Sequence, residues 1–268
     1  MKLRPGTLVA AALALAMNLL LVFSCDVFFS TNLFKMAGLG QVKASDLANE
    51  NSAELVGQAY TADGMPASSF FAALTSDPAA KAKVLATLQA TYSNGAASAA
   101  QQQDAAALAA QVELITTGAD QLVNNVIGPL TDNQLSSSST PAQAVATVQA
   151  LIPANLSSNK ASFEAAVNAL MAANAPYTAL GGSIGASGVA GDINVGTAAQ
   201  SAVVAAVVGG ISATSGSPPE TVSTADLLWA LSQGASTSGY TITFTAPDTQ
   251  SGTPLGSLVG AVGLNLNL

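Results

Sequence analysis

Few side chains in this sequence could do chemistry near neutral pH. Among its 268 residues there is no histidine, one cysteine (Cys25) and one arginine (Arg4). A nucleophilic serine or cysteine needs an adjacent base, most often a histidine, to activate it. The composition therefore excludes Ser-His-Asp and Cys-His catalysis. Serine–lysine pairs, glycine-rich loops and carboxylates are the candidate sites that remain.

A serine–lysine pair stands at Ser157 and Lys160, with the S-x-x-K spacing found in penicillin-binding enzymes. No K-T-G element accompanies it, and serine is frequent in this chain. We therefore expect Ser158 or Asn159 to cap a helix that carries Phe163, and we expect the Phe163 ring to be buried. We predict no catalytic residue at this position.

Two patterns in the last third of the chain could hold a phosphate or a metal ion. Residues 185–191 are glycine-rich but lack the G-K-[ST] ending of a phosphate-binding loop. Asp192 and Asn194 could offer oxygens to calcium, but no acidic residue closes the loop as it does in an EF-hand. We therefore expect a turn stabilised by these two side chains.

Carboxylates alone could support glycoside hydrolysis, which needs only two of them. Sugar-binding enzymes also stack sugars on aromatic rings, and only 5% of these residues are aromatic. An acidic row at Asp46, Glu50 and Glu54 could bind a metal, but its four-residue steps are typical of the solvated face of a helix. We predict no metal ligand and no cofactor, and keep a glycan-acting enzyme as a weaker alternative.

The N-terminal 24 residues have the pattern of an export signal. Lys2 and Arg4 precede an apolar run at residues 8–23 that only Asn18 interrupts. The run is shorter than the roughly 20 residues that a membrane-spanning helix needs. We therefore interpret residues 1–24 as a signal peptide.

The end of this run, Leu21-Val22-Phe23-Ser24-Cys25, resembles the lipobox of bacterial lipoproteins, in the relaxed form seen in spirochaetes. In that family the cysteine thiol receives a diacylglycerol, signal peptidase II cuts before the cysteine, and the new N-terminus is acylated. The resemblance implies that Cys25 is a lipidation site carrying acyl chains such as palmitate. An uncleaved membrane anchor and a plain secretory signal are the alternatives.

Cleavage before Cys25 would leave a strongly acidic chain. Five lysines would face 15 Asp and Glu residues, giving a side-chain charge of −10. So few cations form no basic patch for a phosphate backbone, which excludes nucleic acid as a partner. The single cysteine also excludes a disulfide within the chain.

Residues 25–43 would link the lipid to the folded body, and they are unusually apolar at residues 27–39. Flexible linkers are normally polar. We expect this stretch to pack into the body. The alternative is that it lies in the lipid interface beside the acyl chains.

For the body, residues 44–268, we predict a mainly α-helical fold: an irregular helical bundle or array with a small C-terminal β element. Half of the whole chain is hydrophobic and 8% is charged, and apolar residues recur at helical spacing. Helix starts are predicted at Asp77-Pro78, Thr140-Pro141 and Ser223. Breaks are predicted at Asn94-Gly95, Gly128-Pro129, Pro153 and Pro176.

The last third of the body changes in composition. Glycines gather at residues 181–196, which marks a candidate sub-boundary, and a buried apolar helix is predicted over residues 198–211. Strict alternation of apolar and polar residues predicts strands at residues 240–246 and 264–268, with a short helix between them. These elements make up the β element at residues 240–268.

These features predict a lipid-anchored lipoprotein of a bacterial cell envelope that acts without catalysis. It would be a scaffold or a binder of a partner protein or of an apolar ligand. An accessory helical lipoprotein of a transport system is an alternative. The lipid anchor would lie in the inner or the outer membrane.

Overall fold

The structure of the protein is a computed structural model that describes residues 42–61, 64–123, 156 and 158–263. Several sequence predictions fall outside these residues and concern Cys25, residues 27–39, Thr140-Pro141, Ser157 and residues 264–268.

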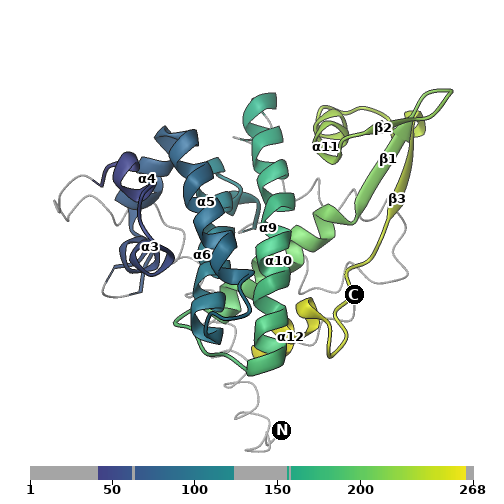
Figure 1. The fold of residues 1–268 in the computed structure, drawn as a ribbon. Coiled ribbons are helices and arrows are strands. Elements are labelled where there is room, and N and C mark those ends of the chain that lie inside the picture. Colours follow the sequence, from purple (N-terminus) through teal and green to yellow (C-terminus); the bar gives the residue numbers. More distant parts are fainter. Residues whose placement is uncertain (1–41, 62–63, 124–155, 157, 264–268) are drawn as a thin grey trace, which may run out of the picture.

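Helices dominate the described chain, which confirms the mainly α-helical prediction (Figure 1). The first group of helices is α2 (Ala44–Leu47), α3 (Ser52–Ala59), α4 (Ser68–Ser76), α5 (Pro78–Tyr92) and α6 (Ala99–Thr117). The second group is α9 (Lys160–Ser187), α10 (Val195–Gly209), α11 (Thr224–Ser232) and α12 (Pro254–Ala261). Three strands complete the body, namely β1 (Ile211–Ser215), β2 (Glu220–Val222) and β3 (Tyr240–Phe244), with a 3-10 turn η1 (Thr237–Gly239) before β3.

Helix α6 lies between two hydrophobic cores and contributes to both. Its residues Ala105, Leu108 and Val112 belong to an N-terminal core built with α2 to α5. Its residues Ala106 and Leu114, from the other face, belong to a C-terminal core built with α9 to α12 and the sheet. Because both faces are buried, α6 shows almost none of the amphipathic pattern of a surface helix.

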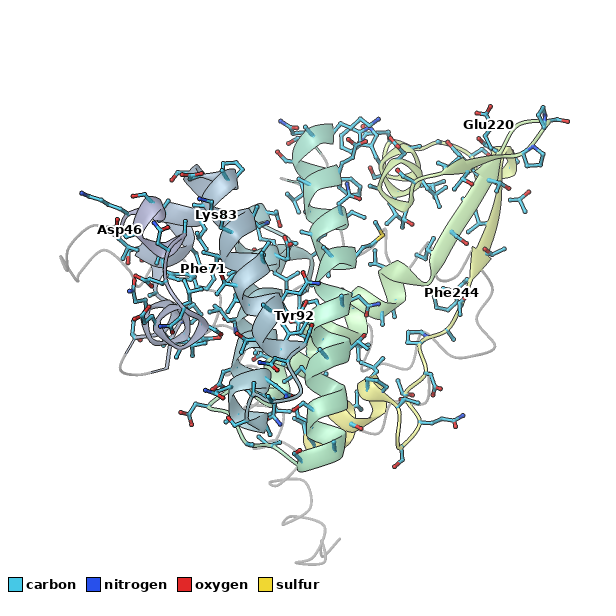
Figure 2. All side chains as sticks on the ribbon, in the orientation of Figure 1. Asp46, Phe71, Lys83, Tyr92, Glu220 and Phe244 are labelled. Atoms are coloured by element: carbon cyan, nitrogen blue, oxygen red, sulfur yellow. The ribbon has the colours of Figure 1, made fainter. Side chains whose placement is uncertain are left out.

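The N-terminal core corrects one sequence interpretation. The acidic row does not lie on a single helix, because α2, which carries Asp46 (Figure 2), ends at Leu47 and α3 begins at Ser52. Asn51 starts α3 by accepting hydrogen bonds from the N–H groups of Ala53 and Glu54, at 3.0 and 3.1 Å. Glu54 accepts from the Asn51 N–H in return, which makes a capping box.

Helix α9 corrects a second interpretation, because it runs through Pro176 without ending there. A proline inside a helix costs about 3 kcal/mol, since it removes one hydrogen bond and crowds the preceding turn. Ala173 and Tyr177 on either side of Pro176 are buried against the C-terminal core. Packing along the whole length of α9 therefore outweighs the local preference for a break.

The glycine-rich stretch begins inside α9, and only residues 188–194 connect α9 to α10. Gly181 and Gly185 lie where α12 crosses α9. A Cβ on Gly181 would overlap the Pro254 carbonyl oxygen, and one on Gly185 would come 2.6 Å from Ser257 Oγ. Glycine is needed at these positions because the two helices approach closely.

The β element is a three-stranded antiparallel sheet in the order β2-β1-β3. The predicted strand at residues 240–246 is confirmed as β3, but its observed partner is β1, which the sequence analysis missed. The predicted apolar helix includes Ile211, whereas α10 ends at Gly209 and Ile211 begins β1. In β1 the buried Ile211 and Ala213 alternate with the exposed Ser212.

Other sequence predictions are confirmed. Asp77 caps α5 with Pro78 at the first helical position, and Ser223 caps α11. The Phe163 ring is fully buried and packs 5.6 Å from the Trp229 ring, measured between centroids. Among the residues that the structure describes, no helix has both the length and the apolar character to span a bilayer.

The crossing of α9 and α12 predicts opposite effects for two adjacent glycines. Gly181→Ala should destabilise the fold by about 1 to 3 kcal/mol, because the new methyl group has no room beside Pro254. Gly182→Ala points into open space and should leave stability unchanged or raise it by up to about 1 kcal/mol. Urea unfolding of both variants measures the difference, and equal stabilities would contradict the close crossing.

Candidate functional site

The structure argues against a serine–lysine site at Lys160. The Lys160 ammonium lies 2.9 Å from Asp226 Oδ1 and 3.0 Å from Glu164 Oε1. These hydrogen bonds, the one to Asp226 first, raise the pKa of Lys160 above its usual value. A general base must be deprotonated, so this lysine is unsuited to activate a serine. As expected, Asn159 caps α9 by accepting from the Ser162 N–H at 3.1 Å.

The glycine-rich connection between α9 and α10 is bound by side chains of α6. The Gln103 Oε1 accepts from the N–H groups of Ala190 and Gly191, at 2.8 and 3.1 Å. The Asp104 Oδ1 accepts from the Asp192 N–H at 3.0 Å. A phosphate would need these N–H groups, and protein oxygens already occupy them. The loop is therefore a structural connection held from within.

Gln103 is fully buried, and both ends of its amide are used. In addition to the two bonds that its oxygen accepts, its Nε2 donates to the Gly188 carbonyl at 2.8 Å and to Ser183 Oγ at 3.3 Å. Burying an amide is costly unless its hydrogen bonds are made. This residue thereby fixes α6, the end of α9 and the connection that follows α9 relative to one another.

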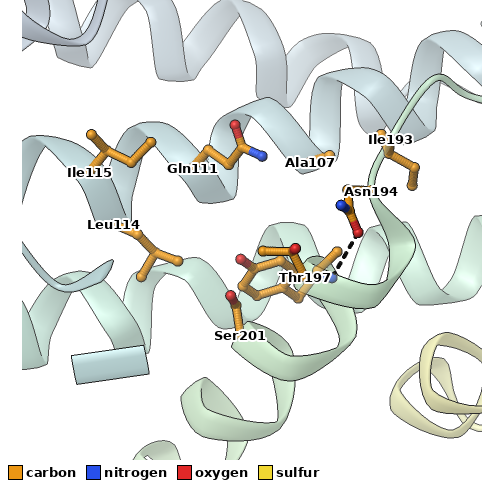
Figure 3. A pocket seen from close by; sticks show the side chains of 10 residues that line it. Ala107, Gln111, Leu114, Ile115, Ile193, Asn194, Thr197 and Ser201 are labelled. Atoms are coloured by element: carbon orange, nitrogen blue, oxygen red, sulfur yellow. Dashed lines mark hydrogen bonds between the residues drawn. The ribbon is translucent and has the colours of Figure 1, made fainter. Parts of the chain in front are cut away.

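Asn194 does not form the predicted turn with Asp192. Its side chain instead caps α10 by accepting from the Thr197 N–H at 3.1 Å (Figure 3). No group of three or more His, Cys, Asp or Glu side chains that could hold a metal ion occurs within the described residues.

A candidate pocket lies where α6, α9 and α10 meet (Figure 3). Its volume is about 20 Å³, which is room for about one water molecule. The side chains around it are apolar or uncharged: Ala107, Gln111, Leu114, Ile115, Tyr177, Ile193, Asn194, Thr197, Ala198 and Ser201. The pocket can hydrogen-bond one small polar molecule but cannot enclose an apolar ligand.

Two tyrosine hydroxyls lie close to this pocket. The Tyr60 hydroxyl donates to Gln111 Oε1 at 3.0 Å, and Tyr177 is hydrogen-bonded to Ser201. Burial is the main cause that raises the pKa of both tyrosines above the usual value, and the charge of Asp104 adds to it for Tyr60. Both phenols therefore stay neutral and act as hydrogen-bonding groups.

Sequence reasoning missed Gln103, Gln111 and the tyrosines. The signal for Gln103 was its position: it precedes Ala107 by four residues and Ala106 by three, on the face of α6 that alanines mark as buried. A polar residue on such a face needs a partner elsewhere in the chain. Which partner it has depends on how α9 returns past α6.

A half-buried carboxyl group, that of Asp120, lies just beyond the end of α6. Burial raises the pKa of Asp120 to about 6, although the N–H groups of Asp120 and Gln121 bind the carboxylate and lower it. Burial is also the main cause that raises the pKa of Asp104. The folded protein thus binds protons on Asp120 more tightly than the unfolded chain does.

We found no protein-family model, no curated protein and no solved structure that matches this chain.

The buried amide of Gln103 predicts a large cost for its removal. Gln103→Leu should destabilise the fold by more than about 2 kcal/mol, because it leaves backbone groups of the α9–α10 connection without partners. Gln103→Glu should be less stable at pH 7 than at pH 4, since only the protonated form can donate to Gly188. Gln89→Leu, at an exposed position in α5, is the control and should change stability by less than about 0.5 kcal/mol. Similar losses at both positions would contradict the assigned role.

Asp120 predicts a pH dependence with a definite sign. Its pKa is raised on folding, so its stabilising contribution is complete below pH 3.8 and is lost as the pH rises through about 6. Asp120→Asn should therefore raise the free energy of unfolding at pH 7 by about 1 to 3 kcal/mol and leave it nearly unchanged near pH 4. Urea unfolding from pH 4 to 8 measures this, with exposed Asp46→Asn as the control. A gain that does not depend on pH would contradict the assignment.

Proposed function

We propose that this protein is a lipid-anchored lipoprotein of a bacterial cell envelope whose helical body holds a partner protein. The observation that carries the proposal is the position of the only cysteine, directly after the apolar run at residues 8–23 and in lipobox register. The helical body that follows would be tethered to the membrane surface through Cys25. An accessory role in a transport system is one form of this proposal.

The surface of the body supports a separate lipid anchor. Among the described residues, Val189 is the one large hydrophobic side chain that is clearly exposed, at 51%. A protein that binds a bilayer directly presents several apolar side chains on one face. The body offers no such face in the part of the chain that the structure describes, so attachment would depend on the lipid at Cys25 and on residues 27–39.

The size of the pocket favours a protein partner over an apolar ligand. A cavity of about 20 Å³ holds a water molecule. Pockets for drug-sized ligands are typically about 300 to 1,000 Å³. Two of the lining side chains already have partners: Gln111 accepts from the Tyr60 hydroxyl at 3.0 Å, and Asn194 accepts from the Thr197 N–H at 3.1 Å. We therefore place the binding function on the surface of the body.

Lipidation is tested by metabolic labelling of producing cells with a clickable palmitate analogue. The natural chain should take up the label, and Cys25→Ser should take up none, because no other thiol is present. The labelled chain should partition with the membrane fraction.

A second variant tests the register. In Cys25→Ser/Ser30→Cys the single thiol is moved five residues out of the lipobox, and this chain should also remain unlabelled. Equal labelling of the natural chain and Cys25→Ser would show that the anchor is not at this cysteine and would remove the main support for the proposed function.

A further inference from the structure

Asn94 and Gly95 lie in the connection between α5 and α6, and both residues are exposed. No other asparagine in the chain is followed by a glycine. The peptide nitrogen that follows an asparagine can attack the carbonyl carbon of its side chain, and a glycine at this position has no side chain to hinder the attack. How readily the attack occurs depends on the hydrogen bonds around the reacting atoms.

The backbone carbonyl oxygen of Asn94 accepts two hydrogen bonds. The Ala97 N–H donates to it at 3.0 Å, and the Gln102 Nε2 donates to it at 2.9 Å. This carbonyl belongs to the same peptide group as the Gly95 N–H. When that N–H loses its proton, the negative charge is shared with the carbonyl oxygen, where the two donors stabilise it. The Gly95 N–H has no hydrogen-bond partner among the residues that the structure describes, so no bond must break first.

The side chain of Asn94 is folded back along the turn. Its Oδ1 accepts from the Ala96 N–H at 3.0 Å, which closes a ring of atoms that includes the Asn94 Cγ and the Gly95 nitrogen. The two reacting atoms are thereby held near each other. The Ala96 N–H also binds the oxygen that gains negative charge when the nitrogen attacks Cγ, as the donors of an oxyanion hole do.

We propose that this turn is a self-modification site, at which the Gly95 nitrogen attacks the Asn94 side chain and converts the asparagine into an acid. A base in solution, such as hydroxide, removes the Gly95 amide proton, and the nitrogen forms a bond to Cγ. The bond from Cγ to Nδ2 breaks, and Nδ2 takes up a proton from water and leaves as ammonia. A succinimide ring remains, and water opens it at either of its carbonyl groups. The products are aspartate and isoaspartate, and the only co-reactant is water.

The isoaspartate product would change the turn itself. Its backbone runs through the former side-chain carbon, so the chain becomes longer by one atom between positions 94 and 95. The former backbone carbonyl, to which Ala97 and Gln102 donate, becomes a free carboxylate. The reaction therefore adds a negative charge and alters the connection between α5 and α6, two helices that share the N-terminal core.

Peptide mapping by mass spectrometry tests the proposal on the full chain, purified in detergent and incubated at mildly alkaline pH. Asn94 should convert to the acid at least about tenfold faster than Asn49, an exposed asparagine followed by a glutamate. Gly95→Ala should slow the conversion at least about tenfold, because the new methyl group crowds the attacking nitrogen. That methyl group meets no atom within 4 Å, so the fold should be unchanged. Conversion of Asn94 no faster than that of Asn49 would overturn the proposal.

A second variant tests the role of the hydrogen bonds. Gln102→Leu removes one donor from the Asn94 carbonyl and should slow the conversion at least about threefold in the folded chain. Gln89→Leu, at an exposed position in α5, is the matched control and should leave the rate unchanged. In urea, where the turn is lost, Gln102→Leu should react at the rate of the natural chain, while Gly95→Ala should still react slowly. A looser turn alone would speed the reaction, so an unchanged or faster conversion in folded Gln102→Leu would refute the assigned role.

Discussion

The described fold depends on one constraint, the burial of α6 on two sides. The N-terminal and the C-terminal core meet on this helix and bury opposite faces of it. The middle of a helix enclosed in this way does not face solvent, so charged side chains are unfavourable there. It must also be slender enough for helices to pack on both sides, and alanine meets both requirements.

Because most packed residues are small, a few positions determine how the helices are arranged. Alanine and glycine let helices approach, but they offer few distinctive shapes to define one arrangement. Where α12 crosses α9, the arrangement of the two helices depends on the absence of a side chain at Gly181 and Gly185. Where α6 meets the connection from α9 to α10, it depends on the amide of Gln103, whose buried hydrogen bonds can be made in one geometry only.

The small number of charged side chains also bears on the function of the protein. Charged residues are few in this chain. Lys160, the lysine of the S-x-x-K pattern, forms ion pairs with the carboxylates of Glu164 and Asp226. The Tyr60 hydroxyl and the Gln111 side chain are hydrogen-bonded to each other, and the phenol stays neutral. Hydrogen bonds of this kind between described side chains stabilise one arrangement of the helices. This agrees with a proposed role in which a membrane-tethered body presents its surface to another protein.

The sequence itself determined several features, because capping and periodicity are local properties. These features are the helix content, the caps at Asp77 and Ser223, the burial of Phe163 and the strand β3. Tertiary structure alone decided three other features. Helix α9 continues past Pro176 because packing on both sides outweighs the local cost of a proline. Residues 211–215 form strand β1 because they pair with β3. Gln103 forms its hydrogen bonds because residues 80 or more positions later in the chain lie beside it. Each of these depends on contacts between segments far apart in the chain, and no local pattern of residues specifies such contacts.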